Sequence, residues 1–151
     1  MSKTVAAGIF LVNKENKLLV CHPTNHKPTF WSIPKGKVED GEYYLDAAIR
    51  ETYEETNVKL ADCKRFITLE PMTYKHKKKV LYPFVVLETE NYHIDFNKFD
   101  LKCNSFVPAD RGGFPEMDAY QWVSLDEAKT MLHETQVECI DKIKKIIDEL
   151  N

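Results

Sequence analysis

The sequence has no segment that would cross a membrane and no signal for export. None of its apolar runs reaches the roughly 18 residues that a membrane-spanning helix requires. The N-terminus also lacks the basic and then apolar pattern of a secretory signal peptide. We therefore expect a cytoplasmic protein without a membrane partner.

The cysteines and histidines are few and widely scattered. No CxxC pair and no HExxH spacing occurs, and these short spacings are what zinc sites usually require. The cysteines lie about forty residues apart, which is typical of reduced, mostly buried thiols in a cytosol-like compartment. They are Cys21, Cys63, Cys103 and Cys139.

What remains is the composition of an ordinary globular protein. The chain of 151 residues suits a single domain, 1–151, with a sizeable core, and its net charge of -3 excludes a strongly charged, disordered class. The charges are unevenly distributed. Acidic residues cluster between 39 and 55, whereas Lys75, Lys77, Lys78 and Lys79 form a basic run, so one site could hold both a cation and an anion.

The first forty residues predict a hairpin followed by a long loop. β-rich runs over 4–12 and 17–22 are separated by the polar turn NKEN. The segment 22–42 is rich in proline and glycine and is predicted to be loop.

A helix is predicted next. It begins near Glu42, with Asp40 as a plausible N-cap, and Asn57 can take the left-handed turn that ends it. The 3.6-residue period places Leu45, Ala48, Ile49, Thr52 and Thr56 toward a core, and Ala47, Arg50, Glu51, Glu54 and Glu55 on other faces.

The second half of the chain mixes strands, an irregular stretch and helices. Strands are predicted over 65–70 and 80–88, and Pro83 pushes the second of these toward a sheet edge or a bulge. Residues 89–118 are the least regular part, and a strand resumes over 119–123.

Two capping boxes predict two closing helices. Ser124 pairs with Glu127 and Thr135 with Glu138. The last helix is expected to bury Ile140, Ile143, Ile147 and Leu150. This order of elements predicts an α+β fold with a mixed sheet.

The most unusual feature of the predicted helix is its carboxylate cluster. Glu51, Glu54 and Glu55 stand at i, i+3 and i+4, where like charges repel and also oppose the helix dipole. An exposed acidic stripe would explain such a cluster in many proteins. However, converging carboxylates are also what a hard divalent cation requires, and Lys35 and Lys37 lie just upstream, where they could contact a phosphate.

The span GKVEDGEYYLDAAIRETYEETNV, residues 36–58, resembles the Nudix box. In that motif Gly, five residues, Glu, seven residues, Arg-Glu, an aliphatic residue, any residue, Glu-Glu, any residue, Gly and an aliphatic residue follow in order. The spacing is intact here. Thr52 replaces the first aliphatic residue and Asn57 the second Gly, and Asn tolerates the same left-handed cap.

The resemblance implies a fold, an activity and a set of roles. The expected fold is the Nudix fold, a mixed β-sheet sandwiched between helices (α/β/α). The expected activity is hydrolysis of a nucleoside diphosphate linked to another moiety, with Mg²⁺, or alternatively Mn²⁺, as cofactor. Glu51, Glu54, Glu55 and the Gly36 carbonyl would be the metal ligands. Arg50 would orient Glu51, and Glu42 would brace the loop before the helix.

Two segments outside the box resemble asymmetrical diadenosine-tetraphosphate hydrolases. WSIPKGKVEDGE, residues 31–42, looks like their WxxPKGxxExGE opening, and residues 115–128 contain a similar Glu-x-x-x-Tyr-x-Trp segment. This similarity implies that Glu116 is a further metal ligand or base, with Tyr120 beside it as a substrate contact and Trp122 in the core. Glu116 follows an irregular loop, so its position depends on how that loop folds.

A third segment, residues 73–84, resembles the strand-loop-strand that binds adenine and polyphosphate in that subfamily. It implies Tyr74 and Tyr82 as stacking aromatics and Lys77 or Lys79 as the cation that meets the phosphates, together with Lys35. The plainer interpretations stay open, because a lysine run is usually a solvated hairpin tip and a strand tyrosine can pack across a sheet.

The chain departs from the subfamily in an insertion at about 89–115, which could cover or reshape the pocket. A dinucleoside polyphosphate such as diadenosine tetraphosphate is the expected small-molecule substrate. Alternatives are the 5' end of RNA, ADP-ribose and inositol pyrophosphates, although the short basic run gives RNA only weak support. A non-catalytic nucleotide sensor would be expected to have lost box carboxylates, and all are present. The oligomeric state and the number of metals are not predicted.

Overall fold

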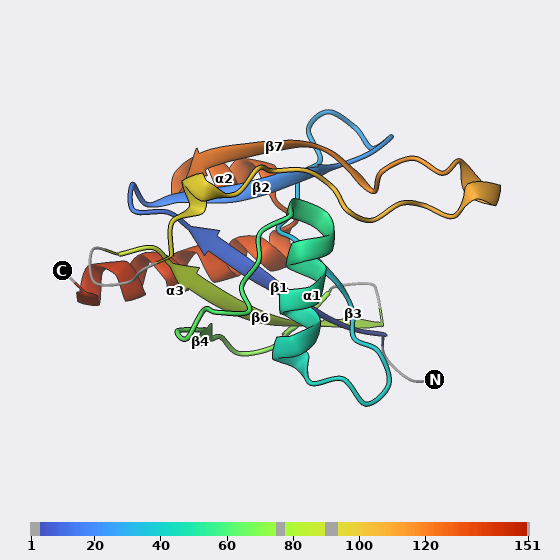
Figure 1. Ribbon diagram of the computed structural model, residues 1–151. Helices are drawn as coiled ribbons and strands as arrows, with labels where there is room; N and C mark the ends of the chain where they lie inside the picture. Colours follow the sequence, from blue (N-terminus) through green and yellow to red (C-terminus); the bar gives the residue numbers. More distant parts are fainter. Residues whose placement is uncertain (1–3, 75–77, 90–93, 151) are drawn as a thin grey trace.

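The computed structural model describes residues 4–74, 78–89 and 94–150 and has one mixed sheet with helices on both faces (Figure 1). Helix α1 packs on one face and helices α2 and α3 on the other, and each face has its own cluster of buried apolar side chains. The expected α+β, helix-sheet-helix architecture is confirmed. The strands are β1 (Thr4–Val12), β2 (Lys17–Pro23), β3 (Lys35–Lys37), β4 (Ile67–Thr68), β5 (Met72–Thr73), β6 (Lys79–Leu87) and β7 (Met117–Ser124).

The sheet is built around the parallel pair β1 and β6. The strand order is β4-β6-β1-β2-β7, with β3 also on β1 and β5 also on β6. The predicted hairpin is confirmed as β1 and β2, joined by a turn in which the Asn16 amide donates to the Asn13 carbonyl. Asn16 takes a positive φ of 60°, a conformation that asparagine tolerates.

Strand β3 lies inside the segment that the sequence predicts to be loop, so that prediction is wrong at this point. Lys35–Lys37 pairs antiparallel with residues 6–8 of β1. The approach is very close, since a β-carbon at Gly8 would lie 2.7 Å from both the Lys35 Cβ and the Pro34 carbonyl oxygen. A strand of three residues is too short to show the alternation of apolar and polar residues by which strands are recognised in a sequence.

Pro83 lies within β6, which is an inner strand rather than an edge. Its carbonyl accepts from the Leu69 amide on the side of β4 and β5. A strand residue directs its N–H and C=O to the same side, so the donor that Pro83 lacks faces the break between those two short strands. The prediction of an edge strand or a bulge at Pro83 is therefore wrong, because β6 pairs with β1 without a register shift and the break lies between its other partners, β4 and β5.

Helix α1 (Tyr44–Thr56) begins two residues after the expected start. Its N-cap is Tyr43, which makes no side-chain cap, so the expected role of Asp40 is wrong. Asn57 ends the helix at φ 70°, as predicted. Ala47 and Glu55 are buried together with the predicted core residues Ala48, Thr52 and Thr56. The helix is thus covered on more than the one side that its periodicity indicates.

The closing helices are α2 (Leu125–Met131) and α3 (Glu134–Leu150). The predicted capping box of Ser124 and Glu127 is confirmed. The second box is wrong, because Thr135 already lies inside α3 and its amide donates to Nδ1 of His133. Ile140 and Ile143 are fully buried, Ile147 is half-buried and Leu150 is 59% exposed.

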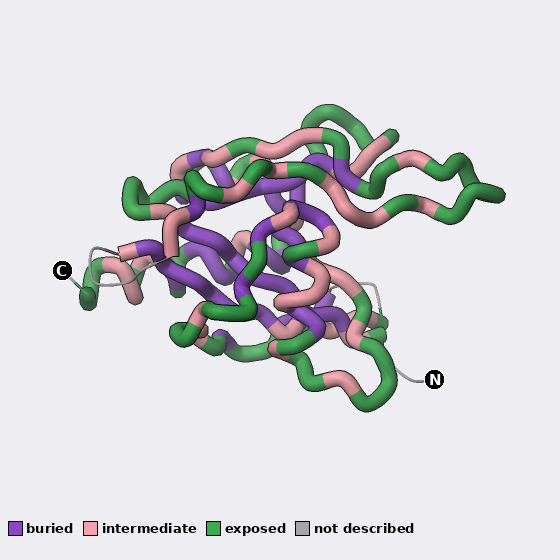
Figure 2. Tube along the Cα trace, in the orientation of Figure 1, coloured by how far each residue is buried: buried purple, intermediate pink, exposed green. Residues whose placement is uncertain are grey.

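Within the predicted insertion, two short 3-10 helices, η1 (Phe96–Lys98) and η2 (Ala109–Arg111), are connected by extended chain. Residues 103–116, here called the arm, fold back on themselves and project from the body (Figures 1 and 2). The two sides of the arm pair through Val107 N to Phe114 O, 2.8 Å, and Glu116 N to Ser105 O, 3.0 Å.

The structure adds two observations on chain chemistry. All four cysteines are free, with Cys21 and Cys139 buried and the other two half-buried. In the described part of the chain, no helix has the length and apolar character needed to cross a membrane.

Candidate active site

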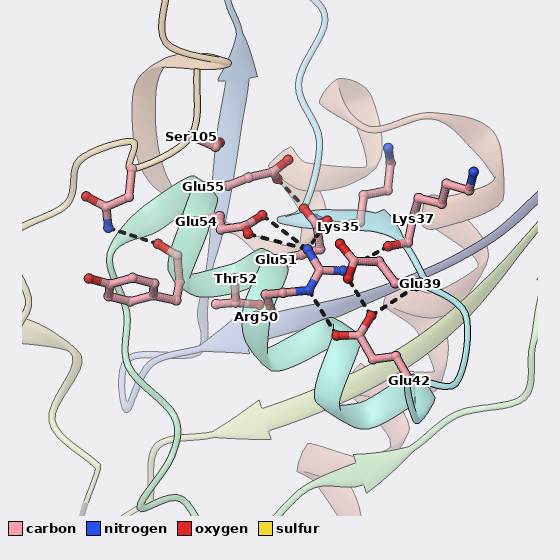
Figure 3. Close-up of polar contacts among 12 residues, drawn as sticks. Lys35, Lys37, Glu39, Glu42, Arg50, Glu51, Thr52, Glu54, Glu55 and Ser105 are labelled. Atoms are coloured by element: carbon pink, nitrogen blue, oxygen red, sulfur yellow. Dashed lines mark hydrogen bonds and ion pairs between the residues drawn. The ribbon is translucent and has the colours of Figure 1, made fainter. Parts of the chain in front are cut away.

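The second half of α1 carries Arg50, Glu51, Glu54 and Glu55, and Arg50 is the centre of the ion pairs at this site (Figure 3). Its Nε and Nη2 donate to the two oxygens of Glu42, at 2.9 and 3.0 Å. Its Nη1 lies 2.8 Å from Glu51 and 3.3 Å from Glu54. Arg50 therefore neutralises part of the negative charge that the helix spacing concentrates.

Glu42 ties this network to the turn before α1. The Arg50 guanidinium holds the pKa of the Glu42 carboxyl below its usual value, and the same carboxyl accepts from the Glu39 amide at 3.1 Å. Arg50 Nη2 also donates to the Lys37 carbonyl at 2.9 Å. The brace expected of Glu42 thus has a visible geometry, joining the turn, β3 and α1.

Glu51 packs directly against Gly36 of β3. A β-carbon at Gly36 would lie 2.0 Å from the Glu51 Cδ, so only glycine leaves room for this carboxylate. Burial raises the pKa of Glu51, although the Arg50 hydrogen bond acts in the opposite direction. The glycine of the box therefore creates the space that this carboxylate occupies.

Glu55 is the most buried box carboxylate, at 4% exposure. Its Oε1 accepts from the Lys35 amide at 3.1 Å, so its carboxyl points toward β3 (Figure 3). Burial raises its pKa to about 8, since the Lys35 charge only partly opposes the burial and the charges of Glu51 and Glu116 add to it. A carboxyl in this setting readily exchanges a proton near neutral pH.

The last turn of α1 is anchored by residues far away in the sequence. The Tyr120 hydroxyl on β7 donates to the Glu55 backbone carbonyl, and the Asn104 amide donates to the Glu54 carbonyl at 2.6 Å. Tyr120 is half-buried against the α1 face of the core. Its role here is to position the helix end, and sequence reasoning missed Asn104 because nothing local marks it.

The donor set has the chemistry of a divalent-cation site. Carboxylate and carbonyl oxygens are the ligands that Mg²⁺ and Mn²⁺ accept, and the raised pKa values of Glu51 and Glu55 reflect burial and charge crowding that a cation would relieve. As placed, Glu51 and Glu54 turn toward Arg50. No group of three or more His, Cys, Asp or Glu side chains is arranged as a ligand set among the described residues. The residue types therefore suit a divalent cation, and the side chains would have to change conformation to bind it.

A cavity of about 620 Å³ opens beside Glu55. Lys35, Glu55 and Glu116 all line it, so the structure brings together three residues that the sequence selected from distant segments. Its other walls come from the loop after β2 and from the arm. Sequence reasoning did not select these other lining residues, and the only signal that pointed to any of them was the insertion. They are Pro23, Thr24, Asn25, His26, Phe30, Ser32, Val107, Phe114 and Met117.

The described substrate contacts expected from residues 73–84 do not line this cavity, and for Tyr74 the expectation is wrong. Tyr74 is 4% exposed, belongs to the core on the α2 and α3 face, and its hydroxyl accepts from Gln136 Nε2 at 3.2 Å. It therefore lies across the sheet from α1 and cannot stack on a base. The reason is strand register, because a shift of one residue reverses the face.

Tyr82 and Lys79, two further members of that set, also lie away from the cavity beside Glu55. Tyr82 stacks on Tyr44 with ring centroids 3.8 Å apart, near the start of α1. Lys79 Nζ lies 4.9 Å from the Tyr74 ring centroid. Neither residue lines the cavity beside Glu55, and Lys77 lies outside the described residues.

The sequence and the fold are similar to those of known proteins. A family model described as NUDIX domain matches residues 2–143. An RNA pyrophosphohydrolase of Pelagibacter ubique is 25% identical over 95% of this chain and 90% of that protein. The asymmetrical bis(5'-nucleosyl)-tetraphosphatase of Rattus norvegicus is 31% identical over 65% of this chain and 58% of that protein. Among solved structures, an Ap4A hydrolase of C. elegans superposes with a TM-score of 0.67 at 22% identity, covering 97% of this chain and 98% of the other.

Proposed function

The chain belongs to the Nudix family of hydrolases, and from that premise we propose that it is a Mg²⁺-dependent pyrophosphohydrolase whose preferred substrate is a dinucleoside polyphosphate. The observation that carries this proposal is the cavity in which Glu55, Lys35 and Glu116 meet beside the carboxylates of α1. It offers oxygen ligands, a cation for phosphate and space for a nucleotide at one place. Diadenosine tetraphosphate, cleaved to ATP and AMP, is the substrate to test first.

The metal ligands of the proposal are Glu51, Glu54, Glu55 and the Gly36 carbonyl, with Glu116 as a further ligand or the base. A bound divalent cation would supply positive charge to the phosphoryl oxygens and lower the pKa of a bound water. Arg50 Nη1 pairs with Glu51 at 2.8 Å and with Glu54 at 3.3 Å, and both carboxylates would turn away from it to reach a cation. Lys35 lines the cavity and offers its ammonium group to the polyphosphate.

The reaction is water attack on phosphorus with expulsion of a phosphate leaving group. A carboxylate must accept one proton from the attacking water. Glu116 is exposed and lines the cavity, so we assign it this role. The new P–O bond forms in line with the anhydride bond that breaks, and no covalent intermediate with the protein is needed.

The names of the relatives support two different substrates. The rat relative is named for hydrolysis of dinucleoside tetraphosphates, and several relatives are named RNA pyrophosphohydrolases. Hydrolysis of the 5' end of RNA is therefore the second candidate. Both substrates present a nucleoside joined to a phosphate chain, so both would use the same carboxylates and the same cavity.

A substrate panel tests the proposal. Purified protein with Mg²⁺, with Mn²⁺ and with a chelator is given diadenosine tri-, tetra- and pentaphosphate, 5'-triphosphorylated RNA, ADP-ribose, nucleoside triphosphates and an inositol pyrophosphate. We expect metal-dependent release of ATP and AMP from the tetraphosphate with the highest kcat/KM. A higher kcat/KM for triphosphorylated RNA would transfer the assignment to the second candidate. Absence of turnover on every substrate with either metal would overturn the proposal.

A further inference from the structure

The cavity beside Glu55 has two walls that the Nudix box does not supply. One is the loop of residues 23–30, here called the β2 loop, and the other is the arm. Phe30 comes from the first, whereas Val107 and Phe114 come from the second. The arm belongs to the insertion by which this chain departs from the diadenosine-tetraphosphate hydrolases that it resembles. One wall of the cavity is therefore specific to this chain.

The two walls are fastened to each other. The Thr24 amide donates to the Glu116 carbonyl at 2.9 Å, and the Thr24 hydroxyl donates to the Pro115 carbonyl at 2.5 Å. Behind them, His22 bridges Asp118 of β7 at 2.6 Å and the Lys27 carbonyl at 2.9 Å. The β2 loop and the arm are thus joined by hydrogen bonds between residues that line the cavity, Thr24 and Glu116 among them.

Both walls present aromatic side chains. Phe30 is 39% exposed and stacks on His26, with ring centroids 5.1 Å apart and planes 20° from parallel. Phe114 is half-buried and sits directly over Gly112, where a β-carbon would lie 2.6 Å from its ring. Gly112 and its φ of 123° therefore allow the turn that carries Phe114.

We propose that Phe114 of the arm and Phe30 of the β2 loop form a nucleobase subsite, which holds the base of the substrate while its phosphates reach Glu55 and Lys35. This inference rests on the proposed function for the identity of the ligand. A volume of about 620 Å³ lies in the range of small-molecule pockets. Flat apolar ring faces accept any base, because every base has a π-face, so the subsite selects nucleotides over base-free pyrophosphates.

Binding measurements test the subsite without turnover. AMP and inorganic pyrophosphate are titrated by calorimetry into the wild type and Phe114→Ala, in chelator and again with Mg²⁺. We expect Phe114→Ala to weaken AMP binding on the order of tenfold and to leave pyrophosphate binding unchanged. Phe114→Tyr keeps the ring and should bind AMP as the wild type does, and Phe30→Ala should repeat the loss.

Phe106→Ala is the matched control. Phe106 lies on the same arm and is 59% exposed, but it does not line the cavity. Its removal should change neither titration. Equal effects of Phe106→Ala and Phe114→Ala, or equal losses of AMP and pyrophosphate binding, would overturn the subsite, since both would indicate a general disturbance of the arm.

Failure of the subsite and failure of the proposed function give different results. Turnover of dinucleoside polyphosphates with a KM that is insensitive to Phe114→Ala would leave the function standing and remove the subsite. Ring-dependent AMP binding without turnover of any panel substrate would do the reverse. A wild type that binds pyrophosphate but not AMP would also overturn the subsite.

Discussion

The side chain of Glu51 occupies the space in which Gly36 would carry a β-carbon, so strand β3 and helix α1 touch at the candidate metal site. Gly36→Ala should therefore displace the Glu51 carboxylate. We expect kcat/KM to fall by about 10- to 100-fold, as for other changes that misplace a metal ligand. Calorimetric titration of Mg²⁺ should show a matching loss of affinity.

Gly41→Ala is the matched control for this substitution. A β-carbon at Gly41 would meet no atom within 4 Å, but the backbone there has a φ of 77°. The substitution should lower the free energy of unfolding by about 1 kcal/mol while leaving metal affinity intact. Retained metal affinity in Gly36→Ala would contradict the role given to the Gly36 and Glu51 contact.

Sequence alone predicted the parts of the site that depend on local spacing. Glu51, Glu54 and Glu55 follow one helix period, and Arg50 lies next to them, so their proximity needs no knowledge of the fold. The left-handed cap at Asn57 is equally local. These features were within reach because a helix fixes the distances between neighbours in sequence.

The parts that sequence missed depend on contacts between distant segments. The burial of Glu55 comes from β3 and from the far strand β7, and the face taken by Tyr74 depends on a strand register. The cavity wall requires the arm to return beside the β2 loop. None of these is encoded in a window of a few residues, so a motif could not reveal them.

Removal of Arg50 should destabilise the metal-free protein. Its side chain is 27% exposed and pairs with Glu42, Glu51 and Glu54. Arg50→Met keeps the length but leaves those carboxylates without their cation, and we expect a loss of about 2 kcal/mol in the free energy of unfolding by urea. Added Mg²⁺ should recover a larger share of stability in the variant than in the wild type, since it replaces the missing positive charge.

Lys144→Met serves as the surface counterpart. Lys144 pairs with Asp126, whose side chain is 80% exposed, so its loss should change the free energy of unfolding by much less than the loss of Arg50 does. If Arg50→Met lowered the free energy of unfolding no more than Lys144→Met does, the ion pairs of Arg50 would be as weak as an exposed surface pair, and this prediction would be wrong.

The stability of the metal-free protein should depend on pH through Glu55. Its pKa rises from 4.5 to about 8 on folding, so between these values the folded state binds more protons than the unfolded state. The contribution of Glu55 to the free energy of unfolding should therefore be fully present below this window and be lost as pH rises through it. Urea titrations across the window should show a shallower fall for Glu55→Gln, which has no proton to lose.

Divalent metal should reverse this trend. A bound cation requires the ionised carboxylate, so stabilisation by Mg²⁺ should grow toward the upper end of the window. A wild type and a Glu55→Gln variant with parallel pH curves would show that the burial of Glu55 does not control its protonation.

Tyr74 should behave as a core residue in every assay. Its hydroxyl accepts from Gln136 Nε2 within the α2 and α3 face, across the sheet from the carboxylates. Tyr74→Phe removes that acceptor but keeps the packed ring, so we expect a loss of about 1 kcal/mol in the free energy of unfolding and an unchanged KM. Phe114→Ala should give the opposite pattern, with a raised KM and little change in stability, because its ring faces the cavity. A KM raised by Tyr74→Phe and untouched by Phe114→Ala would return base recognition to residues 73–84 and move the binding site to the other face of the sheet.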